Sequence, residues 1–334
     1  MEPQHPSSDP AADVFADTDP AGMMAVGRWP AAARPMGLGL MVPIAEGSTF
    51  GGAPRFADML AVARAAEDVG FDAVWFADHL ALGGVGEEPF RGVWDCWTTM
   101  AGIAAATERI QVGALVACTG YRHPGLIAKM AESIDDISDG RFILGLGAGW
   151  HEPEYTMFGL PFDHRVGRFE EAVSIIHPLL RQGHADVHGT YFTVHDAINR
   201  PRGPRPDGPP ILVGTSGPRM LRLTARYADA WNTVWHKDPA AVVPLMAAVD
   251  DACRDVGRDP ATLVRTAGSN FELPGYLGVR PDPIAGSPAE MAVAIAAFRD
   301  LGLHHYVCGL DPCTPESVEW FGRVIELLDR DTAR

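Results

Sequence analysis

Short apolar segments alternate with longer amphipathic ones from residue 36 onward, and this alternation restricts the folds open to the chain. The apolar segments are continuous, as parallel strands require when both faces of their sheet are buried. Eight strands are predicted, at 37–43, 72–77, 110–117, 142–147, 210–213, 229–234, 263–268 and 305–310. With a helix after each strand, the simplest closure is an α/β fold of the (β/α)8, or TIM-barrel, type. An open doubly wound sheet is the competitor, but it would normally divide the chain at a switch point, and no division is visible.

Capping residues indicate where several of the helices begin and end. Asp95 is placed to cap one helix, and Pro124 and Gly140 are placed to open and close the next. Ser287 and Glu290 have the spacing of a capping box ahead of a later helix. These signals support the alternation of strands and helices independently of the apolar pattern.

Two parts of the chain depart from this alternation. Residues 1–35 are rich in Pro, Ala, Asp and Ser and show no periodicity, so we expect a disordered tail, with a short docking arm as the alternative. Residues 36–330 then form a single domain. After the fourth helix, which Pro178 should kink, residues 186–194 indicate a small inserted hairpin.

Composition excludes several classes of function. The formal net charge of −16 argues against nucleic acids and anionic membrane surfaces as partners. No apolar run reaches the roughly 18 residues of a membrane span, and nothing resembles a signal peptide, so we expect a cytoplasmic protein. The five cysteines include no CxxC pair, which favours reduced thiols. Cys308 and Cys313 lack a matching pair, so structural zinc is not expected.

The segment 147–149 is the most informative candidate site. Gly147, Ala148 and Gly149 follow a predicted buried strand, where a barrel places its catalytic residues. Because these residues have little or no side chain, the backbone can come close to a flat or large ligand. Close packing inside the protein explains the glycines equally well. A dinucleotide fingerprint is rejected, because Trp150 stands near where the helix of that motif should begin.

Two further strand ends carry candidate chemistry. Residues 214–217 join a strand to a helix N-terminus, which suits a phosphate group, although a capped helix is the simpler alternative. Asp78 and His79 end another strand, and a histidine there can serve as general acid or base, although for this pair alone a hydrogen-bonded structural role is the favoured explanation. Residues 151–154 resemble metal ligands only superficially, since Pro153 interrupts them, and no metal site is expected.

Several motifs together resemble the bacterial luciferase-like oxidoreductases. They lie at 72–80, 121–154, 158–162, 188–194, 209–232 and 287–307, so the resemblance covers essentially residues 36–330. It implies a TIM barrel that uses coenzyme F420, an 8-hydroxy-5-deazaflavin, or FMN. It also implies a small-molecule substrate and a homodimer.

The resemblance also assigns roles to individual residues. Asp78 and His79 match the family's pair beside the cofactor ring, with His79 as the proton donor or acceptor. A non-proline cis peptide is implied near Ala114 and Leu115. Two groups of residues complete the implied cofactor site. The residues implied to lie against the ring are Gly147, Ala148, Gly149 and Trp150, and those implied to hold the phosphate are Gly214, Thr215, Ser216 and Gly217.

Two departures from the family pattern narrow the choice of cofactor and of substrate. FMN-using relatives carry a basic side chain where this chain has Ala148, which favours coenzyme F420 and leaves FMN as the alternative. In that alternative the protein is a monooxygenase supplied with reduced flavin by a separate reductase. Relatives that oxidise sugar phosphates carry a carboxylate at Trp150, so a flatter or less polar substrate is expected here. A cofactor-binding barrel without turnover and a metal-dependent hydrolase are the rival classes.

Overall fold

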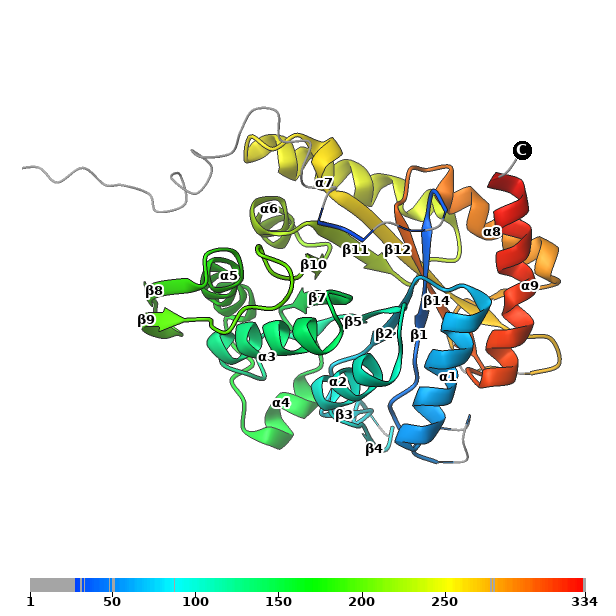
Figure 1. The fold of residues 1–334 in the computed structure, drawn as a ribbon, viewed down its shortest axis with the longest axis horizontal. Coiled ribbons are helices and arrows are strands. Elements are labelled where there is room, and N and C mark those ends of the chain that lie inside the picture. The colour runs from blue at the N-terminus through cyan, green and yellow to red at the C-terminus, as the bar shows by residue number, and fades with distance from the viewer. Residues whose placement is uncertain are drawn as a thin grey trace, which may run out of the picture.

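The computed structural model describes residues 28–30, 32, 34–47, 49, 52–86, 88–276, 278 and 280–332. Its centre is a closed barrel of eight parallel strands (Figure 1). In order around the barrel these are β1 (Gly37–Met41), β2 (Ala73–Phe76), β5 (Gln111–Ala114), β7 (Phe142–Gly147), β10 (Ile211–Gly214), β11 (Ala230–Val234), β12 (Val264–Glu272) and β14 (His305–Asp311). The pairings of β7 with β10 and of β14 with β1 close the ring. The expected barrel is confirmed.

Helices surround the barrel (Figure 1). The main ones are α1 (Phe56–Val69), α2 (Cys96–Ala106), α3 (Pro124–Ile137), α5 (Arg165–Arg181), α6 (Pro218–Tyr227), α7 (Val243–Asp255), α8 (Pro288–Arg299) and α9 (Pro315–Thr332). The expected caps are present, since Asp95 accepts a hydrogen bond from the backbone of Thr98, and Ser287 forms its capping box with Glu290. Helix α5 continues through Pro178 to its end.

Short elements at the carboxyl ends of the strands were not all anticipated. Helix α4 (Glu152–Phe158) follows β7, with Pro153 in its first turn. The expectation that Pro153 interrupts residues 151–154 is therefore wrong, because proline is well tolerated at the start of a helix. The predicted strand 110–117 divides into β5 and β6 (Ala117–Cys118), and the peptide bond between Leu115 and Val116 is cis. The cis bond lies one peptide beyond the position implied by the resemblance.

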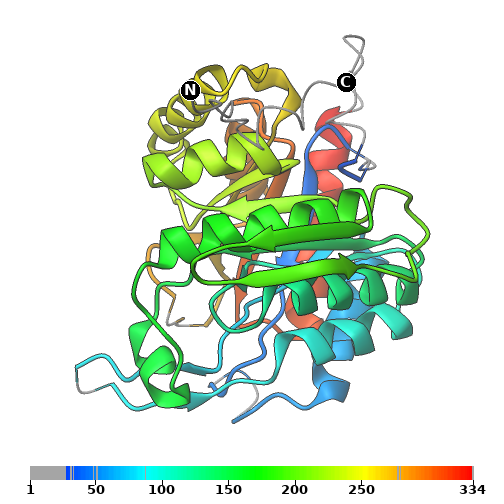
Figure 2. The same cartoon turned by 90° about the vertical axis from the view of Figure 1, so that its left-hand side faces the viewer.

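Other short elements complete the connections: β3 (Ala81–Leu82), β4 (Arg91–Gly92), β13 (Ile284–Ala285) and the 3-10 turns η2 (Pro239–Ala241) and η3 (Pro260–Thr262). The β3–β4 pair and α4 follow β2 and β7, and both views place them together at one end of the barrel (Figures 1 and 2). This end carries the carboxyl termini of the strands, where TIM-barrel enzymes place their chemistry.

The predicted hairpin is formed by β8 (His184–His188) and β9 (Thr193–Ile198). It lies on the outside of α5, away from the barrel axis (Figures 1 and 2). The Glu171 carboxylate on α5 accepts hydrogen bonds from three successive backbone N–H groups in its turn, those of residues 190–192. The turn is therefore fixed to the helix beneath it.

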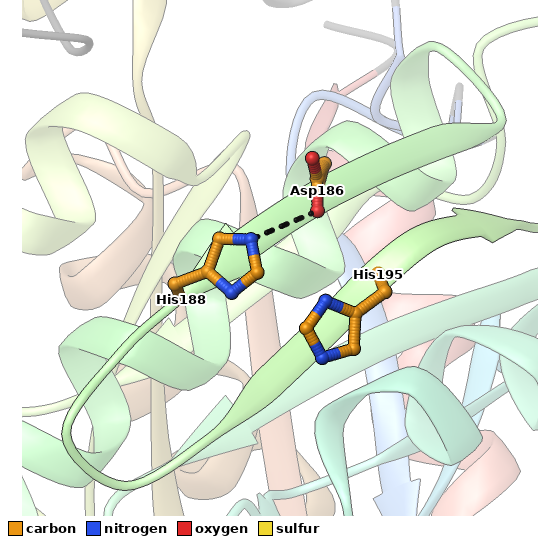
Figure 3. Close-up of side chains that lie close together, drawn as sticks. All are labelled: Asp186, His188 and His195. Atoms are coloured by element: carbon orange, nitrogen blue, oxygen red, sulfur yellow. Dashed lines mark ion pairs between the residues drawn. The ribbon is translucent and has the colours of Figure 1, made fainter.

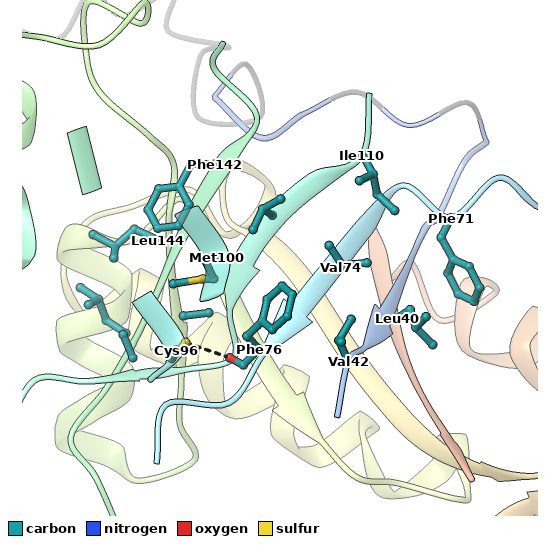
Figure 4. Packing of buried hydrophobic residues seen from close by; sticks show 14 of the residues in the cluster. Leu40, Val42, Phe71, Val74, Phe76, Cys96, Met100, Ile110, Phe142 and Leu144 are labelled. Carbon is teal, nitrogen blue, oxygen red and sulfur yellow. Dashed lines mark hydrogen bonds between the residues drawn. The ribbon is translucent and has the colours of Figure 1, made fainter. Parts of the chain in front are cut away.

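Apolar side chains fill the space between the strands and the surrounding helices. Figure 4 shows Phe76 of β2 near Cys96 and Met100 of α2, and Leu40 of β1 on the side of Phe71; all belong to one buried cluster. Inside the barrel, a second cluster of buried residues includes Trp75, whose indole N–H donates to Nε2 of the fully buried His305 across 3.0 Å. Both sides of each strand are thus buried, which explains the continuous apolar runs.

The described residues that precede β1 contact the barrel. Trp29 packs edge-on against His305, with ring centroids 5.8 Å apart, and Arg34 forms an ion pair with Asp72 at 2.9 Å. These residues cover the amino-terminal end of the barrel. The expected disordered tail falls mainly on residues 1–27, which lie outside the described part of the chain.

All five cysteines are buried free thiols, as expected. Among the helices that the structure describes, none combines the length and the apolar character needed to cross a membrane.

Candidate active site

A cavity of about 590 Å³ opens at the carboxyl ends of the barrel strands. All but one of the site residues expected from the sequence lie around it. Those that do are Asp78, His79, Leu115, Gly147, Ala148, Gly149, Trp150, Gly214, Thr215, Ser216 and Gly217. The exception is Ala114, which is buried in the barrel wall on β5. Six separate strand ends (β1 through Met41, β2, β5–β6, β7, β10 and β11) therefore contribute to one site.

The glycines that follow β7 accommodate side chains of the protein itself. A Cβ atom on Gly147 would lie 2.6 Å from Val116, and one on Gly149 would lie 2.0 Å from the Tyr155 hydroxyl. Gly149 also has a φ of +79°, which disfavours any other residue. Close internal packing thus explains these two glycines, while the backbone between them still borders the cavity.

Asp78 lies at the end of β2 with its side chain fully buried. One carboxylate oxygen, Oδ2, accepts hydrogen bonds from the Cys118 backbone at 2.9 Å and from Arg122 at 2.7 Å. The other oxygen, Oδ1, has no hydrogen-bond partner among the residues that the structure describes. Burial raises the pKa of Asp78, and the Arg122 guanidinium opposes that rise. Asp78, a residue of the cavity wall, therefore holds one buried oxygen without a described partner.

His79 is held by a carboxylate that the sequence analysis did not connect with it. Its Nδ1 lies 2.9 Å from Oε1 of Glu154, and that oxygen also accepts a hydrogen bond from the Tyr121 hydroxyl. The other oxygen, Oε2, accepts from the backbone N–H of Leu80 at 2.7 Å. Burial alone would raise the pKa of Glu154, but the hydrogen bonds from His79, Tyr121 and the backbone outweigh it and lower that pKa. The ionised carboxylate can only accept, so Nδ1 carries the hydrogen and Nε2 is the basic nitrogen of neutral His79.

Cys118 and Tyr155 form a second pair beside the cavity. The Cys118 Sγ lies 2.9 Å from the Tyr155 hydroxyl, which also donates to the Ala148 carbonyl at 3.3 Å. Burial raises the pKa of the Cys118 thiol to about 11. Cys118 is therefore a protonated thiol near neutral pH, which suits packing and hydrogen bonding rather than nucleophilic attack.

The turn at 214–217 leads directly into α6. Gly217 is the N-cap residue, and no side chain in the described part of the chain caps this helix. The alternative of a helix capped by Thr215 or Ser216 is therefore not realised. A Cβ atom on Gly217 would meet no described atom within 4 Å. The first N–H groups of α6 are left without a side-chain acceptor at the edge of the cavity, as an anion site requires.

Trp150 stands at the cavity, with 68% of its surface exposed. Its ring meets that of His79 edge-on, with centroids 5.7 Å apart. Trp235, after β11, is a second aromatic lining residue. The expected aromatic wall is therefore present beside His79.

Sequence reasoning missed Glu154, Tyr121 and Arg122 as parts of this site. One signal was available: acidic residues on both sides of Pro153 are typical of the first turn of a helix. A helix beginning there buries Glu154. The contacts of Tyr121 and Arg122 depend on tertiary structure and have no local signature.

Comparisons with known proteins show what the chain is similar to. The family model described as luciferase-like monooxygenase matches residues 36–271. A phthiodiolone/phenolphthiodiolone dimycocerosates ketoreductase of Mycobacterium bovis (strain BCG / Pasteur 1173P2) is 32% identical over 220 residues, covering 61% of this chain and 58% of that protein. An F420-dependent glucose-6-phosphate dehydrogenase of Microbacterium testaceum (strain StLB037) is 34% identical over 202 residues, covering 58% and 57%. The chain thus spans less than two thirds of the length of these curated relatives.

The barrel also resembles solved structures. A structure titled F420-dependent secondary alcohol dehydrogenase in complex with an F420-acetone adduct matches with a TM-score of 0.75 and 20% identity, covering 88% of this chain and 99% of that one. At this level of identity the match establishes the fold.

Proposed function

The chain belongs to the luciferase-like monooxygenase family, and from that premise we propose that it is a coenzyme F420-dependent oxidoreductase acting on a small organic molecule. One observation carries the proposal. His79, whose Nδ1 is engaged by Glu154, borders the same cavity as Asp78, which has one unsatisfied oxygen, and the uncapped start of α6. An acid–base group (His79), a hydrogen-bond acceptor (Asp78) and an anion-binding helix N-terminus (α6) therefore surround a single cavity.

The cavity fits a deazaflavin or flavin in size and chemistry. Its volume of about 590 Å³ lies within the range usual for cofactor sites. The Asp78 Oδ1 atom needs a donor, which a hydroxyl or N–H group of such a cofactor provides. The uncapped N–H groups of α6 suit the phosphate group that both coenzyme F420 and FMN carry.

The residues of this chain then have distinct tasks. When bound, a deazaflavin supplies two-electron hydride chemistry. Asp78 and the backbone at 147–149 orient the ring, and the turn at 214–217 binds the phosphate. Glu154 holds His79 in one tautomer, so that Nε2 takes or gives the proton at the substrate oxygen.

A carbonyl compound and its alcohol form the substrate pair that suits these groups best. A hydride added to the carbonyl carbon must be matched by a proton on its oxygen, which Nε2 supplies when the His79 imidazole is protonated; in the reverse direction Nε2 of the neutral ring accepts that proton. The ketoreductase named among the relatives is consistent with this class. Trp150 and Trp235 offer aromatic surface rather than charge, which favours a flat or weakly polar substrate.

An FMN-dependent monooxygenase is the second candidate, because the family description itself names that activity. Such an enzyme would receive reduced flavin from a separate reductase. Ala148 supplies no basic side chain, and that supports the deazaflavin over FMN.

Titration of the purified apoprotein with coenzyme F420 and with FMN, each oxidised and reduced, tests the proposal. We expect a change in deazaflavin fluorescence that saturates, and weaker binding of both FMN forms. No saturable deazaflavin signal at tens of micromolar would reject the first candidate. Preferential binding of reduced FMN with oxygen uptake would establish the second. In either case His79→Ala should retain the cofactor and lose turnover.

We also propose that the protein is a cytoplasmic homodimer. Its five thiols are free, as a reducing compartment requires. Phe56, Leu126 and Ile137 are exposed apolar residues on α1 and α3, in the half of the barrel through which relatives are expected to pair. Light scattering should give twice the mass of one chain, and a monomer at all concentrations would reject the dimer.

A further inference from the structure

We propose that the β8–β9 hairpin binds one divalent transition-metal ion, with Zn²⁺ as the probe, through Asp186, His188 and His195. Figure 3 shows the three side chains together on one face, Asp186 and His188 from β8 and His195 from β9. All three are exposed, so an ion can reach them from solvent.

The spacing of the donor atoms matches a metal site. One donor atom from each residue lies within 4.8 Å of the other two. Nε2 of His188 is 3.4 Å from Oδ1 of Asp186. Around a four-coordinate zinc ion with bonds of about 2.1 Å, neighbouring donors are about 3.4 Å apart. The His188–Asp186 pair therefore has the required separation, and a nitrogen of His195 lies within 4.8 Å of both as the third ligand.

The hairpin register brings these residues together. His188 is opposite Thr193, so His195, two residues further along β9, is on the same face as His188. The pairing shifts between Ala185 and Val187, so that His195 and Asp196 both stand opposite Asp186. Such a bulge changes the direction of a side chain, and here it brings the His195 imidazole beside the Asp186 carboxylate.

The site is also preorganised. The Glu171 carboxylate fixes the backbone of the turn, and Arg168 covers the ring of Tyr191 at 4.5 Å. On the opposite face of the hairpin, Ala185 and Val194 are buried. The backbone that presents the three ligands is thus held from below, so binding needs to order only side chains.

The ligand set selects the class of metal. Two imidazoles and one carboxylate suit Zn²⁺, Ni²⁺ or Cu²⁺, whereas Mg²⁺ and Ca²⁺ require oxygen ligands. Three protein ligands leave at least one coordination position for water. None of the three residues lines the active-site cavity, so this site is independent of the proposed oxidoreductase function.

Competition between the full-length, tag-free protein and a chromophoric zinc chelator tests the proposal. We expect one equivalent of Zn²⁺ to bind per chain and His188→Gln or His195→Gln to weaken binding about tenfold or more. His184→Gln is the matched control, because His184 lies on the same hairpin but pairs with Asp196, at 3.5 Å. A 100-fold excess of Mg²⁺ should not displace Zn²⁺.

Three results would overturn the site. These are no binding at millimolar Zn²⁺, wild-type affinity in both His188→Gln and His195→Gln, or an equal loss in His184→Gln. Because all three positions are exposed, the variants should fold normally, which circular dichroism checks.

Discussion

Glu154 lies 2.9 Å from Nδ1 of His79, although the two residues are 75 positions apart in the sequence. The contact joins the end of β2 to the helix that follows β7. The same carboxylate accepts two backbone hydrogen bonds from the segment that follows His79. One buried side chain therefore fixes both the imidazole and the chain that carries it.

Replacing Glu154 by Gln should lower turnover by roughly 10-fold to 1,000-fold, within the usual contribution of acid–base groups. An amide cannot accept from all four donors at once, so the fixed tautomer of His79 is lost. Nitrogen NMR of labelled histidine should show a mixture of tautomers in the variant and one in the wild type. This readout does not require cofactor.

Glu152→Gln is the control for that experiment. Glu152 lies on the same helix but is exposed. It should keep the wild-type tautomer and turnover. If Glu154→Gln also keeps both, the proposed role of the carboxylate is wrong.

Replacing Asp78 by Asn should weaken cofactor binding by about tenfold or more. The unsatisfied oxygen of Asp78 faces no described partner, so a bound cofactor is its expected donor. As the control, Asp95→Asn removes the negative charge of the other carboxylate that Arg122 contacts, at 3.0 Å, and leaves Asp78 itself unchanged. Equal affinity in the Asp78 variant and the wild type would remove Asp78 from the cofactor site.

Gly149→Ala should be distinctly more destabilising than Gly257→Ala. Both glycines have nearly the same left-handed φ, +79° and +76°, so both variants incur about 1–2 kcal/mol of backbone strain. Only at Gly149 would the new Cβ collide with the Tyr155 hydroxyl, while at Gly257 no described atom lies within 4 Å. Urea unfolding of the two variants measures the difference, and equal losses would show that the collision is relieved easily.

Acidification should destabilise the protein between about pH 6.5 and pH 3. Burial lowers the pKa of His305 to about 3, whereas an unfolded histidine has a pKa near 6.5. Between these values the unfolded chain binds a proton that the folded chain does not, so stability falls as pH falls, by about 1.4 kcal/mol per pH unit. In His305→Gln, whose side-chain oxygen can still accept from Trp75, the stability from urea unfolding should depend less on pH. An unchanged slope would contradict this origin.

The barrel could be predicted from the sequence because its signals are local. Strand β7 occupies the residues expected of it, 142–147, since a run buried on both faces is apolar throughout. The contact between Glu154 and His79 could not be predicted in the same way, because it depends on where a short helix packs. The cluster on the hairpin was hidden for a related reason: the bulge that places His195 opposite Asp186 is a property of strand register, which the sequence of either strand alone does not specify.

Trp29, Trp75 and His305 close the barrel at the end opposite the cavity. Under the proposed function, cofactor and substrate would share one route in and out, and the molecule that binds deeper would have to arrive first and depart last. We therefore expect a compulsory order of binding, in which release of the inner molecule waits for release of the outer one.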